Sequence, residues 1–238
     1  MKLVFFDDFR LCVIRDHLVV DVSATVREIP HTGSHDLISG LIARFGHYRS
    51  RIEEAAYTGT AMPIDKMRLR SPLPKPCNID CMAVNYMEDG TRSEPAPINA
   101  FFKSPNSVIG DADTLVLPNI PATIFEGEAE VAVVIGKRAS NVSEAEAMSH
   151  VFGYMNFIEG SARGLLPPGN TLHKRQPRET LAPMGPGMGT ASVSKARENL
   201  TVNLGGQRVP TTELSTGTKA PKTGHSPQSS APNQPRSS

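Results

Sequence analysis

The sequence contains no tryptophan, few aromatic residues, no long hydrophobic run and almost no net charge. Its 25 Lys and Arg residues against 24 Asp and Glu residues give a net charge of +1, which argues against a broad field for binding nucleic acid or a membrane. The opening MKLVFFDDFRL has a short apolar patch broken by Asp7 and Asp8. We therefore expect no secretory signal and no membrane span. A cytoplasmic protein without nucleic-acid or membrane partners is predicted.

Cysteine is also scarce. Cys12, Cys77 and Cys81 suit a reducing compartment better than a disulfide framework, and no second pair or nearby histidine completes a zinc site. Proline, in contrast, is abundant, with 20 residues spread along the chain. This distribution favours many short strands and loops over long helices.

Hydrophobic periodicity divides the chain into a small N-terminal α/β domain, residues 1–70, and a main domain, residues 77–204. A proline-punctuated connector, residues 69–76, separates them. In the first domain the pattern predicts strands at 2–6, 11–14 and 18–22, followed by helices at 36–45 and 49–56.

In the main domain we predict several strands and one short helix. Ser143 and Glu146 form a capping box that opens a helix at 145–152. The strands are expected at 79–84, 108–110, 114–118, 153–158 and 200–204. The segment 205–238 has Val209 and Leu214 as its only large apolar residues, so we predict a disordered tail.

The stretch FEGEAEVAVVIGKR, residues 125–138, carries glutamates at every second position before an apolar β-branched block. A strand turns alternate side chains to one face, so Glu126, Glu128 and Glu130 should point the same way at the mouth of a buried strand. Unpaired carboxylates beside a core are costly, and a hard divalent cation would relieve that cost. The alternative is a solvated strand end.

Several motif fragments occur in a fixed order between about residue 70 and residue 190. They are Val84-Asn85-Tyr86, Phe102-Lys103-Ser104-Pro105, Gly127-Glu128-Ala129-Glu130 with Val133-Val134-Ile135-Gly136-Lys137, Gly153-Tyr154, Ser161-Ala162-Arg163 and Leu181-Ala182-Pro183-Met184-Gly185-Pro186. In this combination the chain resembles the fumarylacetoacetate hydrolase family.

The resemblance implies an α+β, β-rich fold: a mixed β-sandwich roll behind the small N-terminal domain, usually as a homodimer. It also implies Mg²⁺, or Mn²⁺ or Ca²⁺ in its place, and a small 2-oxo or 1,3-dicarbonyl acid as substrate. Hydrolysis, decarboxylation and isomerisation all occur in the family. Its metal ligands map to Glu128, Glu130 and Glu159, the last replacing an aspartate.

The resemblance further implies roles in substrate binding and catalysis. Lys103 and Arg163 could offset substrate charge, or could form ordinary ion pairs. Asn85 and Tyr86 are expected to bind substrate, although a tyrosine at a strand end is as often a packing residue.

The catalytic residues also depart from the family pattern. Asp89 stands where the family often has a general-base histidine, so Asp89 or Glu88 would handle the proton. Lys174 is the nearest candidate for a lysine that the family usually has close to Gln176.

The family continues its β-roll past residue 204, whereas here a low-complexity segment follows. An incomplete roll would leave strand edges unpaired. Three hypotheses result: a metal-dependent enzyme on a small oxo-acid, a non-catalytic homologue that serves as a binding or assembly subunit, and an unrelated β-rich domain with a solvated acidic strand end.

Overall fold

The computed structural model describes residues 1–83, 97–165, 179–190, 201–204 and 207–210. Within these ranges the protein is α+β and rich in strands, with both antiparallel and parallel pairing, which confirms the predicted class. No helix in the described part of the chain is both long and apolar enough to span a membrane. The tail beyond residue 210 lies outside the described residues, so its predicted disorder stays a prediction.

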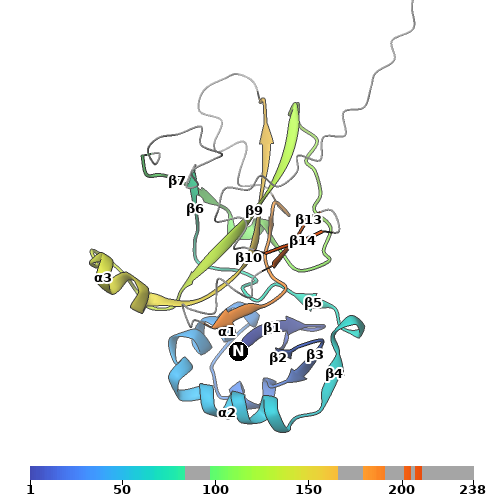
Figure 1. Ribbon diagram of the computed structural model, residues 1–238, viewed down its shortest axis with the longest axis vertical. Helices are drawn as coiled ribbons and strands as arrows, with labels where there is room; N and C mark the ends of the chain where they lie inside the picture. The colour runs from blue at the N-terminus through green and yellow to red at the C-terminus, as the bar shows by residue number, and fades with distance from the viewer. Residues whose placement is uncertain (84–96, 166–178, 191–200, 205–206, 211–238) are drawn as a thin grey trace, which may run out of the picture.

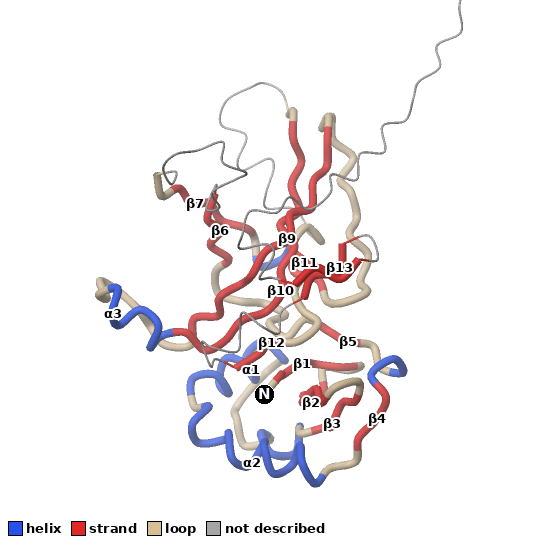
Figure 2. The backbone as a smooth tube through the Cα atoms, in the orientation of Figure 1, coloured by secondary structure: helices blue, strands red, loops and turns tan. Residues whose placement is uncertain are grey.

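The N-terminal part is an antiparallel meander covered by two helices (Figures 1 and 2). Its elements confirm the strands and helices predicted for this region. They are β1 (Lys2–Phe6), β2 (Arg10–Arg15), β3 (Leu18–Asp21), α1 (Ser34–Ala43), α2 (Phe45–Thr58) and β4 (Ala61–Pro63).

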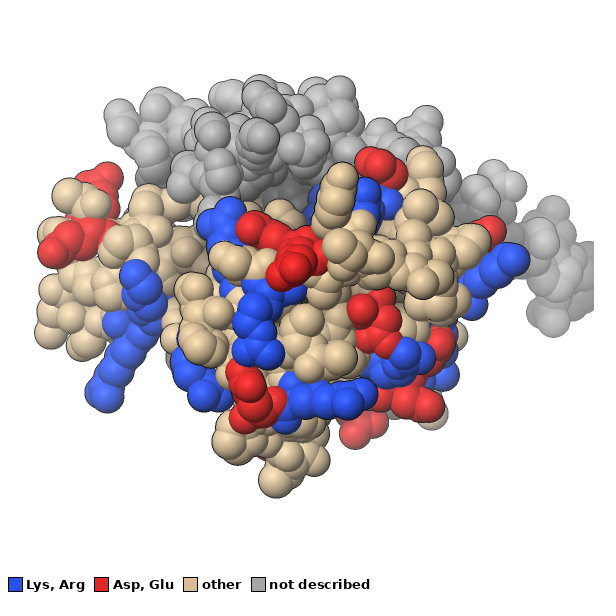
Figure 3. Space-filling view, turned by 90° about the horizontal axis from the view of Figure 1, so that it is seen from below, with Lys and Arg blue, Asp and Glu red and all other residues tan. Residues whose placement is uncertain are grey.

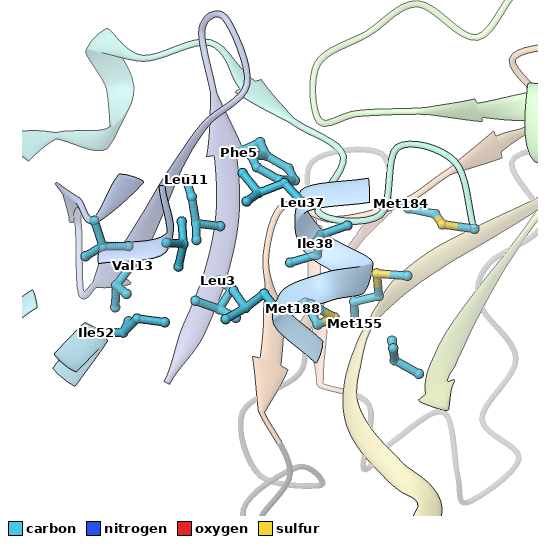
Figure 4. Close-up of a cluster of buried hydrophobic side chains, with 14 of the residues drawn as sticks. Leu3, Phe5, Leu11, Val13, Leu37, Ile38, Ile52, Met155, Met184 and Met188 are labelled. Atoms are coloured by element: carbon cyan, nitrogen blue, oxygen red, sulfur yellow. The ribbon is translucent and has the colours of Figure 1, made fainter. Parts of the chain in front are cut away.

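The two helices bury the apolar stripe that their periodicity predicts. Leu37 and Leu41 of α1 and Ile52 of α2 are buried against the inner face of the meander. Met155 and Met188, from much later in the chain, belong to the same hydrophobic cluster, as Figure 4 shows. Each such side chain contributes about 1.5–3 kcal/mol on burial, so this shared core binds early and late segments together.

The outer face of the molecule in Figure 3 carries Lys and Arg side chains among Asp and Glu side chains. Arg49 pairs with Glu53 on α2 at 2.9 Å, and Arg51 of α2 pairs at 2.6 Å with Glu28, which precedes α1. Opposite charges are thus interspersed on this face rather than gathered into a field of one sign.

A long antiparallel ribbon dominates the rest of the structure. Its strands are β9 (Ile124–Ile135) and β10 (Val151–Arg163). The short strand β12 (Met188–Thr190) pairs with β10 on one side and with β1 on the other. One sheet of order β4-β3-β2-β1-β12-β10-β9 therefore joins the meander to the ribbon. The predicted domain division at residues 70–77 stays a prediction.

The junction between β10 and β12 depends on a glycine. A Cβ atom added at Gly153 would lie 2.1 Å from the carbonyl oxygen of Gly189, far inside contact distance. The two backbones can approach this closely only because position 153 has no side chain.

All but one of the remaining described strands form two-stranded sheets. Strand β6 pairs antiparallel with β7, β8 pairs parallel with β11, β13 pairs antiparallel with β14, and β5 pairs with β1. Their bounds are β5 (Leu69–Arg70), β6 (Ile79–Ala83), β7 (Asn99–Lys103), β8 (Val108–Ile109), β11 (Ala182–Pro183), β13 (Thr201–Leu204) and β14 (Gln207–Pro210). Strand β14 falls within the segment predicted to be disordered, so that prediction can apply only beyond it.

The predicted helix at 145–152 is wrong in its second half. The helix α3 (Glu144–Ala147) is followed by a 3₁₀ turn, η5 (Met148–His150), and β10 begins at Val151. The capping box is present, since the Glu146 carboxylate accepts a hydrogen bond of 3.4 Å from the backbone N–H of Ser143. The pairing of Val151 with Ile135 of β9 overrides the local helical preference. Other 3₁₀ turns are η1 (Ser23–Val26), η2 (Ile64–Lys66) and η4 (Pro105–Ser107).

The predicted strand at 114–118 is also wrong, because this segment forms no strand pairing. Val116 and Leu117 are more than half exposed. The backbone N–H of Val116 donates to the Thr180 hydroxyl at 2.8 Å, and that hydroxyl lies 3.2 Å from the Val116 carbonyl. A side chain thus satisfies the groups that a partner strand would otherwise bind.

Candidate metal centre

The three alternating glutamates lie on one face of the ribbon and meet a fourth carboxylate there. Glu128 of β9 is directly opposite Glu159 of β10, Glu126 is opposite Ser161, and Glu130 is opposite Phe157. Directly opposed residues of an antiparallel pair project to the same side, and residues two apart on a strand share that side. The ribbon therefore brings the predicted ligands Glu128, Glu130 and Glu159 to one face.

Arg163 binds two of these carboxylates at once. Its Nε donates to Glu126 Oε2 at 2.7 Å and its Nη2 donates to Glu128 Oε1 at 2.6 Å. Arg163 lies on the same face because it follows Glu159 by four residues on β10. Its side chain is 38% exposed, so the pairs are partly screened by water. This arrangement matches the ion-pair alternative for Arg163.

Lys103, at the end of β7, forms the deepest ion pair of the site. Its Nζ lies 2.8 Å from Glu159 Oε1 and donates to the Gly160 carbonyl at 2.7 Å. The two side chains are 0% and 7% exposed, so this is a buried pair rather than the surface pair that the sequence suggests as an alternative. Lys103 thus neutralises the carboxylate that lies deepest on the ribbon face.

The electrostatics of the face reflect crowding of like charges. Partial loss of hydration raises the pKa of Glu128 above its usual value, and the Glu159 carboxylate adds to this effect while Arg163 opposes it. The balance of these effects keeps the pKa of Glu128 raised. Any further cation at this face would favour its charged form.

Cys81 of β6 is a neighbour of the site that sequence reasoning missed. Burial raises the pKa of its thiol to about 12, Lys103 lowers it, and Glu159 and Glu130 raise it again. The thiol is therefore protonated at neutral pH and is a poor metal ligand in that form. The sequence offers one weak signal, namely that β6 leads directly toward Asn85 and Tyr86.

The donor set fits a hard divalent cation in its chemistry. Carboxylate oxygens are the ligands that Mg²⁺, Mn²⁺ and Ca²⁺ prefer. Glu159 Oε1 is buried, and among the described residues it receives no well-directed hydrogen bond in spite of its close contact with Lys103. A buried carboxylate oxygen with spare capacity is what a cation site requires.

The described residues contain no group of three His, Cys, Asp or Glu side chains close enough together to hold a metal ion. Glu128 and Glu159 are each paired with a cationic side chain instead, Glu128 with Arg163 and Glu159 with Lys103. A metal centre built from Glu128, Glu130 and Glu159 would therefore need their side chains to turn toward one another.

The other predicted site residues lie outside the described residues. They are Asn85, Tyr86, Glu88, Asp89 and Lys174. Their roles in substrate binding and proton transfer stay predictions.

The fold and this face together define a β-rich α+β protein with an oxygen-rich candidate cation site. The family model "Fumarylacetoacetate (FAA) hydrolase C-terminal" matches residues 78–219, more than half of the chain. The protein belongs to the fumarylacetoacetate hydrolase family, as the motif fragments predict.

Two curated relatives are similar to this chain over part of their length. The oxaloacetate tautomerase YisK of Bacillus subtilis is 33% identical over 129 residues, which are 52% of this chain and 43% of YisK. A fumarylacetoacetate hydrolase domain-containing protein 2 homolog of Dictyostelium discoideum is 28% identical over 195 residues, 74% of this chain and 58% of that protein. The chain thus spans about half the length of these relatives.

Solved structures agree on the fold. The maleylpyruvate hydrolase of Sphingobium sp. SYK-6, in complex with manganese(II) and pyruvate, is 29% identical with a TM-score of 0.69, covering 80% of this chain and 67% of that one. The fumarylacetoacetate hydrolase of Exiguobacterium antarcticum, at 22% identity, has a TM-score of 0.63, covers 80% of this chain and 67% of that one, and supports the fold alone.

Proposed function

We propose that this protein is a divalent-metal-dependent enzyme acting on a small 2-oxo or 1,3-dicarbonyl acid. The observation that carries the proposal is the opposition of Glu128 and Glu159 on one face of the ribbon, with Glu130 two residues along β9. The manganese and pyruvate in the Sphingobium enzyme support the choice of a metal and an oxo-acid. We take Mg²⁺ as the metal, with Mn²⁺ or Ca²⁺ as substitutes.

Glu128, Glu130 and Glu159 would hold the cation through carboxylate oxygens. When bound, the cation supplies Lewis-acid polarisation of the substrate carbonyl and stabilises negative charge that develops next to it. The buried Lys103 holds Glu159 in place through the 2.8 Å ion pair and through its bond to Gly160.

The remaining residues would bind substrate and move a proton. Arg163 stands at the edge of the acidic face, where a guanidinium can pair with a substrate carboxylate in two parallel hydrogen bonds. We assign Asn85 and Tyr86 to substrate binding and Lys174 to stabilising developing negative charge. Asp89 or Glu88 would take up the proton, which requires a carboxyl with a pKa closer to neutrality than usual.

The test uses the purified full-length chain. Mg²⁺ or Mn²⁺ should raise the melting temperature, because a ligand that binds only the folded state stabilises it. Glu130→Ala should abolish the rise, whereas Glu144→Ala, on the exposed helix α3, should leave it unchanged. Oxaloacetate and a set of acylpyruvates should then be consumed in a metal-dependent manner. Absence of any metal-dependent rise for the wild-type protein would reject the proposal.

A non-catalytic binding or assembly subunit is the second candidate. The ion pairs that already occupy Glu128 and Glu159 favour it, as does Asp89 in place of a histidine. It predicts metal-dependent stabilisation without turnover of any oxo-acid in that set. Either protein would be a homodimer under our proposal, and its mass in solution tests this.

A further inference from the structure

Arg163 is placed where it must compete with a cation. One guanidinium spans Glu126 and Glu128, with contacts of 2.7 Å and 2.6 Å. Glu128 is also one of the three proposed ligands and faces Glu159 across the ribbon. Glu128 Oε1 accepts this hydrogen bond at 2.6 Å, so a metal that coordinates Oε1 competes with the guanidinium for the same oxygen.

Glu126 can keep the Arg163 guanidinium bound when Glu128 releases it. It lies two residues before Glu128 on the same face of β9, and it binds Nε of Arg163 rather than Nη2. The contact to Glu128 can therefore break while the contact to Glu126 stays. Loss of the Glu128 contact would leave Nη2 available as a donor beside the acidic face.

We propose that Arg163 is an exchangeable counter-ion of the metal centre. Cation binding releases Nη2 from Glu128, Glu126 retains Nε, and the freed edge of the guanidinium becomes the binding group for a carboxylate of the oxo-acid. The cation then binds before the oxo-acid, because the cation creates the free guanidinium edge. This inference rests on the proposed function, since it needs a cation at Glu128.

The experiment separates competition from a general effect of charge. Mg²⁺ binding is measured by calorimetry for the wild-type protein, for Arg163→Gln and for Arg163→Lys. Lysine keeps the charge but lacks the planar fork through which Arg163 holds Glu126 with Nε and Glu128 with Nη2. Removing or weakening the competitor should tighten Mg²⁺ binding about two- to fivefold, the range expected for a partly exposed ion pair. Arg49→Lys, in an exposed pair on α2, is the matched control and should change nothing.

Oxalate is the second probe, added with and without saturating Mg²⁺. Wild-type protein should bind oxalate only with Mg²⁺ present, and Arg163→Gln should bind it several-fold more weakly in spite of its tighter hold on Mg²⁺. Melting temperatures in a chelating buffer show that each variant is folded.

Each outcome decides a different point. If Arg163→Lys binds Mg²⁺ like the wild type and only Arg163→Gln binds it more tightly, the effect is one of charge and the exchange is refuted. Weaker Mg²⁺ binding in both variants also refutes it. If only the variants bind Mg²⁺, the competition is supported and the proposed function of the wild-type chain fails. If no form binds Mg²⁺, both proposals fall.

Discussion

The buried pair between Lys103 and Glu159 offers the sharpest test of the energetics of the site. Replacing Lys103 by methionine keeps the aliphatic stem and removes the ammonium, which leaves a carboxylate that is 7% exposed without its closest cation. Truncating one partner of a buried pair typically costs about 3–5 kcal/mol. We expect Lys103→Met to lose stability within that range, a large share of the 5–15 kcal/mol typical of a folded domain.

The Lys103–Glu159 pair should contribute far less to the free energy of unfolding than the loss in Lys103→Met suggests. Lys103→Met combined with Glu159→Met replaces both charges by apolar groups of similar size, which is often neutral or stabilising. The double variant should therefore be clearly more stable than Lys103→Met alone. Arg49→Met, which breaks an exposed pair with Glu53, should cost only about 0.3–0.5 kcal/mol.

Urea unfolding in a chelating buffer measures these differences, with the slope of the transition checked for constancy. The double-mutant cycle then isolates the coupling between positions 103 and 159. A loss below about 1 kcal/mol for Lys103→Met, or simple additivity of the two single variants, would refute the reasoning, because a buried charge cannot lose its counter-ion at so small a cost.

Two further predictions concern thiols and glycines. Cys77 is exposed and should react quickly with a disulfide reagent. Cys12 and Cys81, whose pKa values are raised from 9.0 to about 12, should react only as the protein unfolds. Mass spectrometry after brief labelling at pH 8 checks this, and fast labelling of Cys12 would contradict it. Gly153→Ala should lower the melting temperature sharply because its methyl group meets a backbone carbonyl of β12. Gly46→Ala, in α2 with open space around it, should instead stabilise the protein by about 0.5–1 kcal/mol. Equal effects of the two changes would contradict the close approach of the β10 and β12 backbones at Gly153.

Local patterns predicted the elements that form from neighbouring residues. Strand β1 coincides with the alternating run at 2–6, and the glutamates at every second position lie on one strand face as expected. A local preference for one type of secondary structure can be overridden by pairing with a segment that is distant in the sequence. Val151 belongs to β10 because it pairs with Ile135 of β9, and the backbone of Val116 bonds a threonine side chain instead of a partner strand.

The candidate site was only partly accessible from the sequence for the same reason. Motif resemblance supplied Glu128, Glu130 and Glu159, but the opposition of Glu128 and Glu159 follows from the register of the ribbon. The preference of Arg163 for Glu126 and Glu128, and of Lys103 for Glu159, depends on distances between segments far apart in the chain. Composition and periodicity carry no information about such distances.

The three-residue strand β12 sets a condition on when this protein can fold during its synthesis. Lys2 of β1 pairs with Gly189 of β12. Strand β1 is therefore synthesised long before β12, which is among the last of the described strands to leave the ribosome. Until then Lys2 and Leu3 lack their partners in β12, although β5 can already pair with Phe5 and Phe6, and Met188 is missing from the core around Leu3. Contacts between such distant residues slow folding and prolong the exposure of apolar strands. The chain is thus most prone to aggregate during the part of its synthesis when the N-terminal meander is complete but β12 is not yet available.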